Sequence, residues 1–182
     1  MSTPAAHTGS TTSYVVLLRG INVGGRNRLP MATLRSLVED LGMSDPATYL
    51  QSGNLVVTSE RSSDEVGEQI RSALVDRVGL EVAVIVRSVA QWRAVIAANP
   101  YPTETDGTKV HVLVMAEALE DRDVEPSGSE SMTVSGSEIY LHLPDGLGRS
   151  KLAQRLGRAP VTGDGTMRNW NTVLALAELA SS

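Results

Sequence analysis

The order of apolar runs in the first half of the chain constrains its fold more than any other feature. A short continuous apolar run is followed by a helical repeat, two further short runs, a second helical repeat and a last apolar run. This order predicts β-α-β-β-α-β, the split βαβ arrangement of a ferredoxin-like unit. The predicted strands are 14–18, 48–51, 55–59 and 81–87, and the predicted helices are 31–41 and 64–78.

The pattern of the second half predicts an arrangement of strands and helices that resembles the first half only loosely. Ser88 and Gln91 have the spacing of a capping box, which predicts that a helix starts at residue 89. Strands are expected near 109–115, 132–135 and 138–143, and helices near 150–157 and 170–180. We therefore predict an α+β protein with a ferredoxin-like subdomain at 14–87 and a second α+β subdomain at 88–182 that ends in a helix. Residues 1–13, rich in Ser, Thr and Ala, are expected to form a disordered tail.

Composition excludes several classes of function. The chain of 182 residues has no cysteine, so disulfides, thiolate metal ligands and a cysteine nucleophile are excluded. Aromatic residues make up only 3%, which argues against a stacking platform for single-stranded nucleic acid. No secretory leader is recognisable and no apolar run has membrane-spanning length, so we expect a cytoplasmic protein without a membrane partner.

Charge is distributed unevenly along the chain, although the net charge is only −5. Residues 1–36 carry four basic residues and no acid, and residues 149–168 carry five basic residues and one acid. Residues 117–145 carry eight acids and one arginine. If the two basic stretches meet in space, an acidic protein would present one positive face; otherwise the charges solvate separate surfaces.

The segment Arg19–Pro30 (RGINVGGRNRLP) connects the first predicted strand to the first predicted helix. It contains three glycines, two asparagines, three arginines and no acid. A glycine loop in this position can turn backbone N–H groups toward an anion, and Arg26 and Arg28 could clamp an oxyanion. The alternative is a structural loop whose glycines satisfy special dihedral angles. Neither the P-loop nor the dinucleotide pattern is present, which disfavours a nucleotide hydrolase or a Rossmann enzyme.

Two further polar clusters lie at predicted helix starts. Arg149 and Lys151 flank one start, where helix N–H groups and cations could cradle a phosphate. Arg168 could bind an anion beside the other start, which Asn169 can cap. The structural alternatives are solvated charge for the first cluster, and an ion-paired arginine with a core tryptophan for the second. The histidines have no compact ligand spacing, so no metal site is predicted.

Five motifs, taken in order, resemble a bacterial family known as domain of unknown function 1697. They are LLRGINVGGRNRLPM, TYLQSGNLV, ANP, YLHLPDGLGRSKL and TMRNWNTV, and they span about residues 14 to 180. The resemblance implies a two-part α+β fold with ferredoxin-like character. It implies no activity and no catalytic residues.

The leading functional hypothesis is an Arg/Asn/Gly-rich groove that binds a phosphate-bearing ligand, with RNA or DNA backbone favoured. No cofactor is expected. The alternatives are an enzyme that uses the same arginines on a small phosphorylated or carboxylate metabolite, and a structural or interaction module without a ligand. The predicted ligand-binding residues are Arg19, Asn22, Gly24, Gly25, Arg26, Arg28, Ser52, Asn54, Arg149, Lys151, Arg168 and Asn171.

Overall fold

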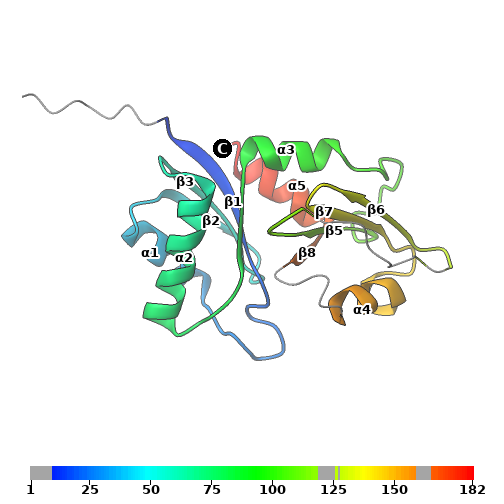
Figure 1. Ribbon diagram of the computed structural model, residues 1–182, viewed down its shortest axis with the longest axis horizontal. Coiled ribbons are helices and arrows are strands. Elements are labelled where there is room, and N and C mark those ends of the chain that lie inside the picture. The colour runs from blue at the N-terminus through cyan, green and yellow to red at the C-terminus, as the bar shows by residue number, and fades with distance from the viewer. Residues whose placement is uncertain (1–9, 119–125, 127, 159–164) are drawn as a thin grey trace, which may run out of the picture.

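A computed structural model describes residues 10–118, 126, 128–158 and 165–182. They form two four-stranded antiparallel sheets, with strand orders β2-β3-β1-β4 and β6-β7-β5-β8 (Figure 1). The first unit contains β1 (Thr12–Leu18), α1 (Met31–Asp40), β2 (Ser44–Tyr49), β3 (Asn54–Ser59), α2 (Ser63–Val78) and β4 (Val84–Ser88). This confirms the α+β class and the βαββαβ order of the first half.

The second unit follows without a break. It contains α3 (Val89–Ala97), β5 (Val110–Val114), β6 (Ser131–Ser135), β7 (Glu138–His142), the 3₁₀ turn η1 (Leu147–Arg149), α4 (Lys151–Arg158), β8 (Thr166–Asn169) and α5 (Trp170–Leu179). The predicted capping box of α3 is present, because Ser88 and Gln91 exchange side-chain and backbone hydrogen bonds. The division into a subdomain at 14–87 and a second at 88–182 stays a prediction.

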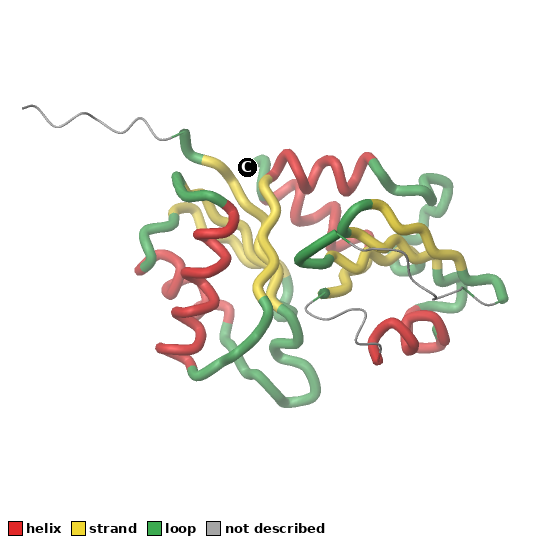
Figure 2. The backbone as a smooth tube through the Cα atoms, viewed as in Figure 1, coloured by secondary structure: helices red, strands yellow, loops and turns green. Residues whose placement is uncertain are grey.

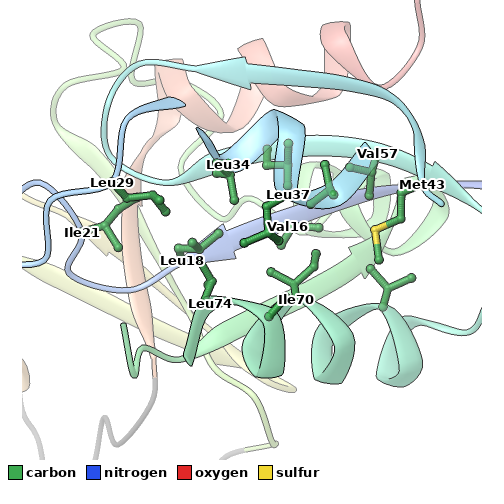
Figure 3. Close-up of a cluster of buried hydrophobic side chains, with 14 of the residues drawn as sticks. Val16, Leu18, Ile21, Leu29, Leu34, Leu37, Met43, Val57, Ile70 and Leu74 are labelled. Carbon is green, nitrogen blue, oxygen red and sulfur yellow. The ribbon is translucent and has the colours of Figure 1, made fainter. Parts of the chain in front are cut away.

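Alternating side chains of the central strand β1 serve two different cores. Tyr14, Val16 and Leu18 face α1 and α2, where they join the cluster drawn in Figure 3. Val15 and Leu17 point to the other face of the sheet. A strand buried on both faces reads as a continuous apolar run, which is why its sequence lacks the usual alternation of apolar and polar residues.

Helices α3 and α5 form a layer between the two sheets. They contribute Trp92, Val95, Val173 and Leu176 to a cluster that includes residues of both sheets. Helix α4 covers the opposite face of the second sheet through Leu152 and Leu156. In Figure 1, α1 and α2 lie on the outer side of the first sheet at the left, and α4 lies below the second sheet at the right.

Some strand bounds differ from those predicted, for local reasons. Thr12 and Ser13 were assigned to the tail, but they begin β1; residues 1–9 lie outside the described part. Strand β2 begins earlier than predicted, and its register with β3 shifts between Ser44 and Ala47, which breaks the period-two pattern. Strand β8 was not predicted, because its four residues include only one buried side chain.

The two units share their strand order and their register, although the sequence suggested only a loose likeness. In β1, Val15 pairs with Arg87 of β4, and in β5, Val112 pairs with Arg168 of β8. In each unit the residue after this arginine caps the next helix, which begins at once. The units therefore repeat one strand order without an evident repeat of sequence.

Candidate functional site

The Arg19–Pro30 loop folds back at a tight turn. Several of its residues adopt a left-handed backbone conformation, which accounts for its glycines and asparagines. Gly20, Asn22, Gly24, Gly25 and Asn27 all have positive φ, a conformation that glycine and asparagine tolerate best. At the tip, residue 26 donates its backbone N–H to the carbonyl of residue 23 at 3.0 Å, and the two central glycines have the positive φ values of a type I′ turn. Figure 2 shows the loop projecting from one end of the first sheet, at the bottom of the view.

Asn22 fastens this loop to the β2–β3 turn. Its side-chain Nδ2 donates to the carbonyls of Leu29 (2.9 Å) and Gln51 (2.7 Å), while its Oδ1 accepts the N–H of Leu29 (2.8 Å). Ile21 and Leu29, near the two ends of the loop, point into the first core (Figure 3). The loop is thus anchored at its base and exposed at its tip.

Gly53 brings the β2–β3 turn against the end of β1. Its φ is +78°, and a Cβ there would lie 2.8 Å from the Cβ of Leu18 and 2.9 Å from Cγ1 of Ile21. Its carbonyl accepts the N–H of Leu18 at 2.8 Å. Only glycine fits this contact without a shift of the chain.

Arg168 joins the second sheet to this end of the first sheet. All five of its N–H donors have acceptors within the protein: the carbonyls of Leu18, Ser52 and Met167, Oδ1 of Asn54 and Oγ1 of Thr166. Burial lowers the pKa of Arg168 to about 10, so the guanidinium stays charged at neutral pH. Its contacts leave no donor for an external anion.

Asn54 is fully buried, and it completes the same junction. Its Nδ2 donates to the carbonyl of Tyr49 and to Oγ of Ser52, both at 2.9 Å, while its Oδ1 accepts from Arg168. Ser52, Asn54 and Arg168 therefore form a hydrogen-bonded support beneath the loop.

The exposed cations of this site are on the loop. Arg26 and Arg28 are exposed and Arg19 is partly exposed. Within the described residues, none of the three side chains forms a hydrogen bond or an ion pair. A surface hollow beside the loop is lined by Asn22, Gly25, Arg28, Leu29, Pro30 and Gln51.

Arg149 and Lys151 line a different hollow, shared with Glu130 and Asp145. Backbone N–H groups at the start of α4 already have partners, because Glu130 accepts from Leu152 at 3.1 Å and Ser150 accepts from residue 153 at 2.9 Å. A carboxylate of the protein therefore occupies the position where a phosphate was predicted to bind.

Asn171 is also apart from the loop, since its side chain packs against the backbone of Gly107. The structure thus gathers nine of the twelve predicted residues at one end of the first sheet, and these nine are Arg19, Asn22, Gly24, Gly25, Arg26, Arg28, Ser52, Asn54 and Arg168.

A second arginine junction, absent from the sequence predictions, mirrors that of Arg168. Arg87 of β4 donates to the carbonyls of Val86 and Met115, to Oγ of Ser137 and to Oε1 of Glu138. The carboxylate lies 3.1 Å from Nη2, and both side chains are 13% exposed. The sequence signal was an arginine directly before the helix cap in both halves, in VRS and in MRN.

His111 and His142 lie on opposite faces of the second sheet, and His7 lies outside the described residues. His111 is buried on the α4 side, its Nδ1 has no hydrogen-bond partner among the described residues, and burial lowers its pKa. His142 is bound by Glu104 instead, with 3.0 Å between Nε2 and Oε2. No cluster of three or more potential metal ligands occurs in the described ranges.

Nucleic acid could not use the sheet face that many ferredoxin-like RNA-binding domains present. That face of the first sheet packs against α3 and α5, with Val15, Leu17 and Val56 buried there. A polyanion would have to bind at the loops instead.

In the described part of the chain, no helix combines the length and apolar character needed to cross a bilayer.

Two antiparallel sheets around a shared helical layer, with a basic loop anchored at one end, define a two-unit α+β protein whose first unit has the ferredoxin-like βαββαβ order. The chain belongs to the family described as protein of unknown function (DUF1697), whose model matches residues 11–140. The structure of conserved bacterial protein SP0830 from Streptococcus pneumoniae is similar, with a TM-score of 0.80 and 22% sequence identity. The match covers 94% of this chain and 99% of that chain, and it concerns the fold. No curated protein matches the chain.

Proposed function

We propose that the protein binds the phosphate backbone of a nucleic-acid duplex through the Arg19–Pro30 loop. The observation that carries this proposal concerns two exposed guanidinium groups, those of Arg26 and Arg28, which have no partner among the described residues. They lie on a loop that its own hydrogen bonds hold in place. A guanidinium that is not committed within the chain can donate two parallel hydrogen bonds to one phosphate.

The charge around the loop supports a polyanion as the ligand. Neither the loop nor the turn 49–54 contains an acidic residue, whereas the protein as a whole carries a net charge of −5. A small positive surface attracts phosphate, while the acidic remainder of the protein repels it. This difference favours one orientation of binding.

Anchoring of the loop adds to this support. Because Asn22 and Asn27 already fix the backbone, binding would cost little conformational entropy in the loop itself. Ser52, Asn54 and Arg168 act in this proposal as positioning residues beneath the surface. The loop arginines, with the backbone N–H groups of Gly24 and Gly25, make the contacts.

The test is fluorescence anisotropy with short labelled DNA and RNA duplexes at low and at physiological salt. The variant Arg26→Ala/Arg28→Ala should weaken binding to every sequence about equally, and it should reduce the slope of log affinity against log salt by about two. Arg71→Ala/Arg77→Ala removes the same charge from α2, where Glu68 and Asp40 already pair with the two arginines, and should leave binding nearly unchanged.

The region of α4 provides a second comparison. Arg149→Ala/Lys151→Ala should have little effect, because Glu130 and Asp145 offset these cations locally. Equal losses in this variant and in the loop variant would show that both regions bind one ligand. If the wild type binds no duplex even at low salt, the proposed function is wrong.

A further inference from the structure

Two aliphatic side chains stand exposed beside the loop arginines. Val23 at the loop tip is 63% exposed, and Leu50 in the β2–β3 turn is 58% exposed. They are the two most exposed large hydrophobic side chains in the described ranges, and neither belongs to a hydrophobic cluster. Exposed apolar side chains that lie together mark a contact surface more often than scattered ones do.

The backbone of Leu50 makes its exposure harder to explain by folding alone. Its φ is +57°, in the left-handed region that a branched side chain disfavours and that asparagine or glycine adopts readily. A leucine at this position is unfavourable both for its backbone and for its exposed surface. Such strain at an exposed residue is typical of functional sites.

Asn22 places the two side chains on neighbouring loops. Val23 follows Asn22 directly, Leu50 precedes Gln51 directly, and Nδ2 of Asn22 lies 2.7 Å from the carbonyl oxygen of Gln51. Arg28 lines one surface hollow with Asn22 and Gln51, and Arg26 lies on the same loop; neither guanidinium has a partner among the described residues. Apolar tips beside unpaired arginines fit a ligand that offers both anionic groups and an apolar interior.

We propose that Leu50 and Val23 enter the minor groove of duplex DNA as wedges at a flexible pyrimidine–purine step, while Arg26 and Arg28 hold the flanking phosphates. Proteins that bind in this way insert aliphatic side chains between base pairs and bend the duplex, at steps that unstack easily. The inference rests on the proposed function and adds to it the kind of duplex and the contact that bends it.

The test uses the variant Leu50→Asn/Val23→Thr in the full chain. Asparagine keeps the left-handed backbone and threonine keeps the β-branched shape, so the melting temperature should be unchanged or higher. Affinity for a duplex with a central TA step should fall about tenfold, because two buried apolar contacts are lost. Bending of the same duplex, measured by energy transfer between dyes at its ends, should disappear. Val134→Thr on β6, which is 45% exposed in the wild type, is the matched control and should change neither quantity.

The outcomes separate this inference from the proposed function. Suppose that Arg26→Ala/Arg28→Ala loses salt-sensitive binding while Leu50→Asn/Val23→Thr binds and bends DNA like the wild type. The insertion of Leu50 and Val23 is then wrong, and the proposed binding of the phosphate backbone is supported. If the wild type binds no duplex DNA at low salt, the wedge inference is overturned, and a parallel titration with duplex RNA decides whether the backbone site survives. Binding to vesicles of phosphatidylglycerol and phosphatidylcholine, lost in the wedge variant and without any binding to DNA, would also overturn the inference.

Discussion

Arg168 of the second unit donates hydrogen bonds to acceptors in the first unit. It was a candidate anion ligand, but its five donors are all used by carbonyl, amide and hydroxyl oxygens of the protein. No carboxylate is among these partners. A buried guanidinium with this many acceptors stabilises the fold mainly because its removal would leave those acceptors unpaired.

We predict that Arg168→Ala lowers the free energy of unfolding by about 3–5 kcal/mol, since a charged, buried hydrogen-bonding group is removed. Arg168→Lys should recover only part of this loss, because an ammonium has three donors and cannot match the planar fork. Urea denaturation at neutral pH measures the free energy of unfolding of both variants. The exposed Arg93, whose guanidinium bonds only to Ser181 among the described residues, gives the control: Arg93→Ala should change stability by less than about 0.5 kcal/mol.

At the scale of elements, one carboxylate of the connection from α3 to β5 bonds to the second sheet, and another bonds within the connection. Hydrogen bonds from His142 and from the backbone N–H of residue 106 hold the pKa of Glu104 below its usual 4.5. Hydrogen bonds from Thr108 likewise hold the pKa of Asp106 below 3.8. Tyr101 adds a ring contact with His142, with 5.5 Å between the ring centroids.

This segment should therefore loosen in acid. A carboxyl group whose pKa is lower in the folded state contributes stability above its unfolded pKa, and the contribution is lost as pH falls from about 4.5 through the folded value. Glu104→Gln should speed hydrogen exchange of the 101–109 amides at neutral pH. The difference from wild type should shrink as pH falls from about 4.5 through the pKa of Glu104 in the folded protein. Glu39→Gln on α1 removes an exposed carboxylate and should not affect these amides. A constant difference across this pH range would contradict the assignment.

At the scale of the whole molecule, the two units contact each other in a reciprocal way. Arg87 of the first sheet reaches the β5 end and the start of β7, while Arg168 of the second sheet reaches the β1 end and the start of β3. Within the second unit, Nε1 of Trp92 donates to the carbonyl of Val173 at 3.0 Å, and the Tyr140 hydroxyl donates to the carbonyl of Val95 at 2.7 Å, so that α3 is bonded to both α5 and β7. Burial raises the pKa of Tyr140 to about 12.

We predict that the two units unfold in a single transition, because they share the central apolar layer and both arginine junctions. Arg87→Ala leaves the carboxylate of Glu138 without its partner and should lower stability by about 3–5 kcal/mol without splitting the transition. Tryptophan fluorescence reports on Trp92 and Trp170 in this layer, and far-ultraviolet circular dichroism reports on all elements. Two separate midpoints, in either protein, would show that the units fold independently.

Patterns in the amino-acid sequence were enough to predict the class of the fold, the order of elements in the first half and the position of the basic loop. These follow from local physics, because apolar periodicity, helix caps and glycine-rich turns act over a few residues. Neither these local signals nor the resemblance of the five motifs to the family could separate residues that support a loop from residues that could contact a ligand.

The tertiary structure alone decided that separation. Arg168 and Arg26 are both arginines in polar motifs. Arg168 is saturated by acceptors from β1, the β2–β3 turn, β3 and β8, whereas Arg26 is exposed and has no partner among the described residues. The two junctions likewise join residues far apart in sequence, because Arg87 bonds to Met115, 28 positions away, and Arg168 bonds to Asn54, 114 positions away. Whether a charge is used within the protein or left for a ligand depends on which acceptors the completed fold brings to it, and no local pattern encodes that.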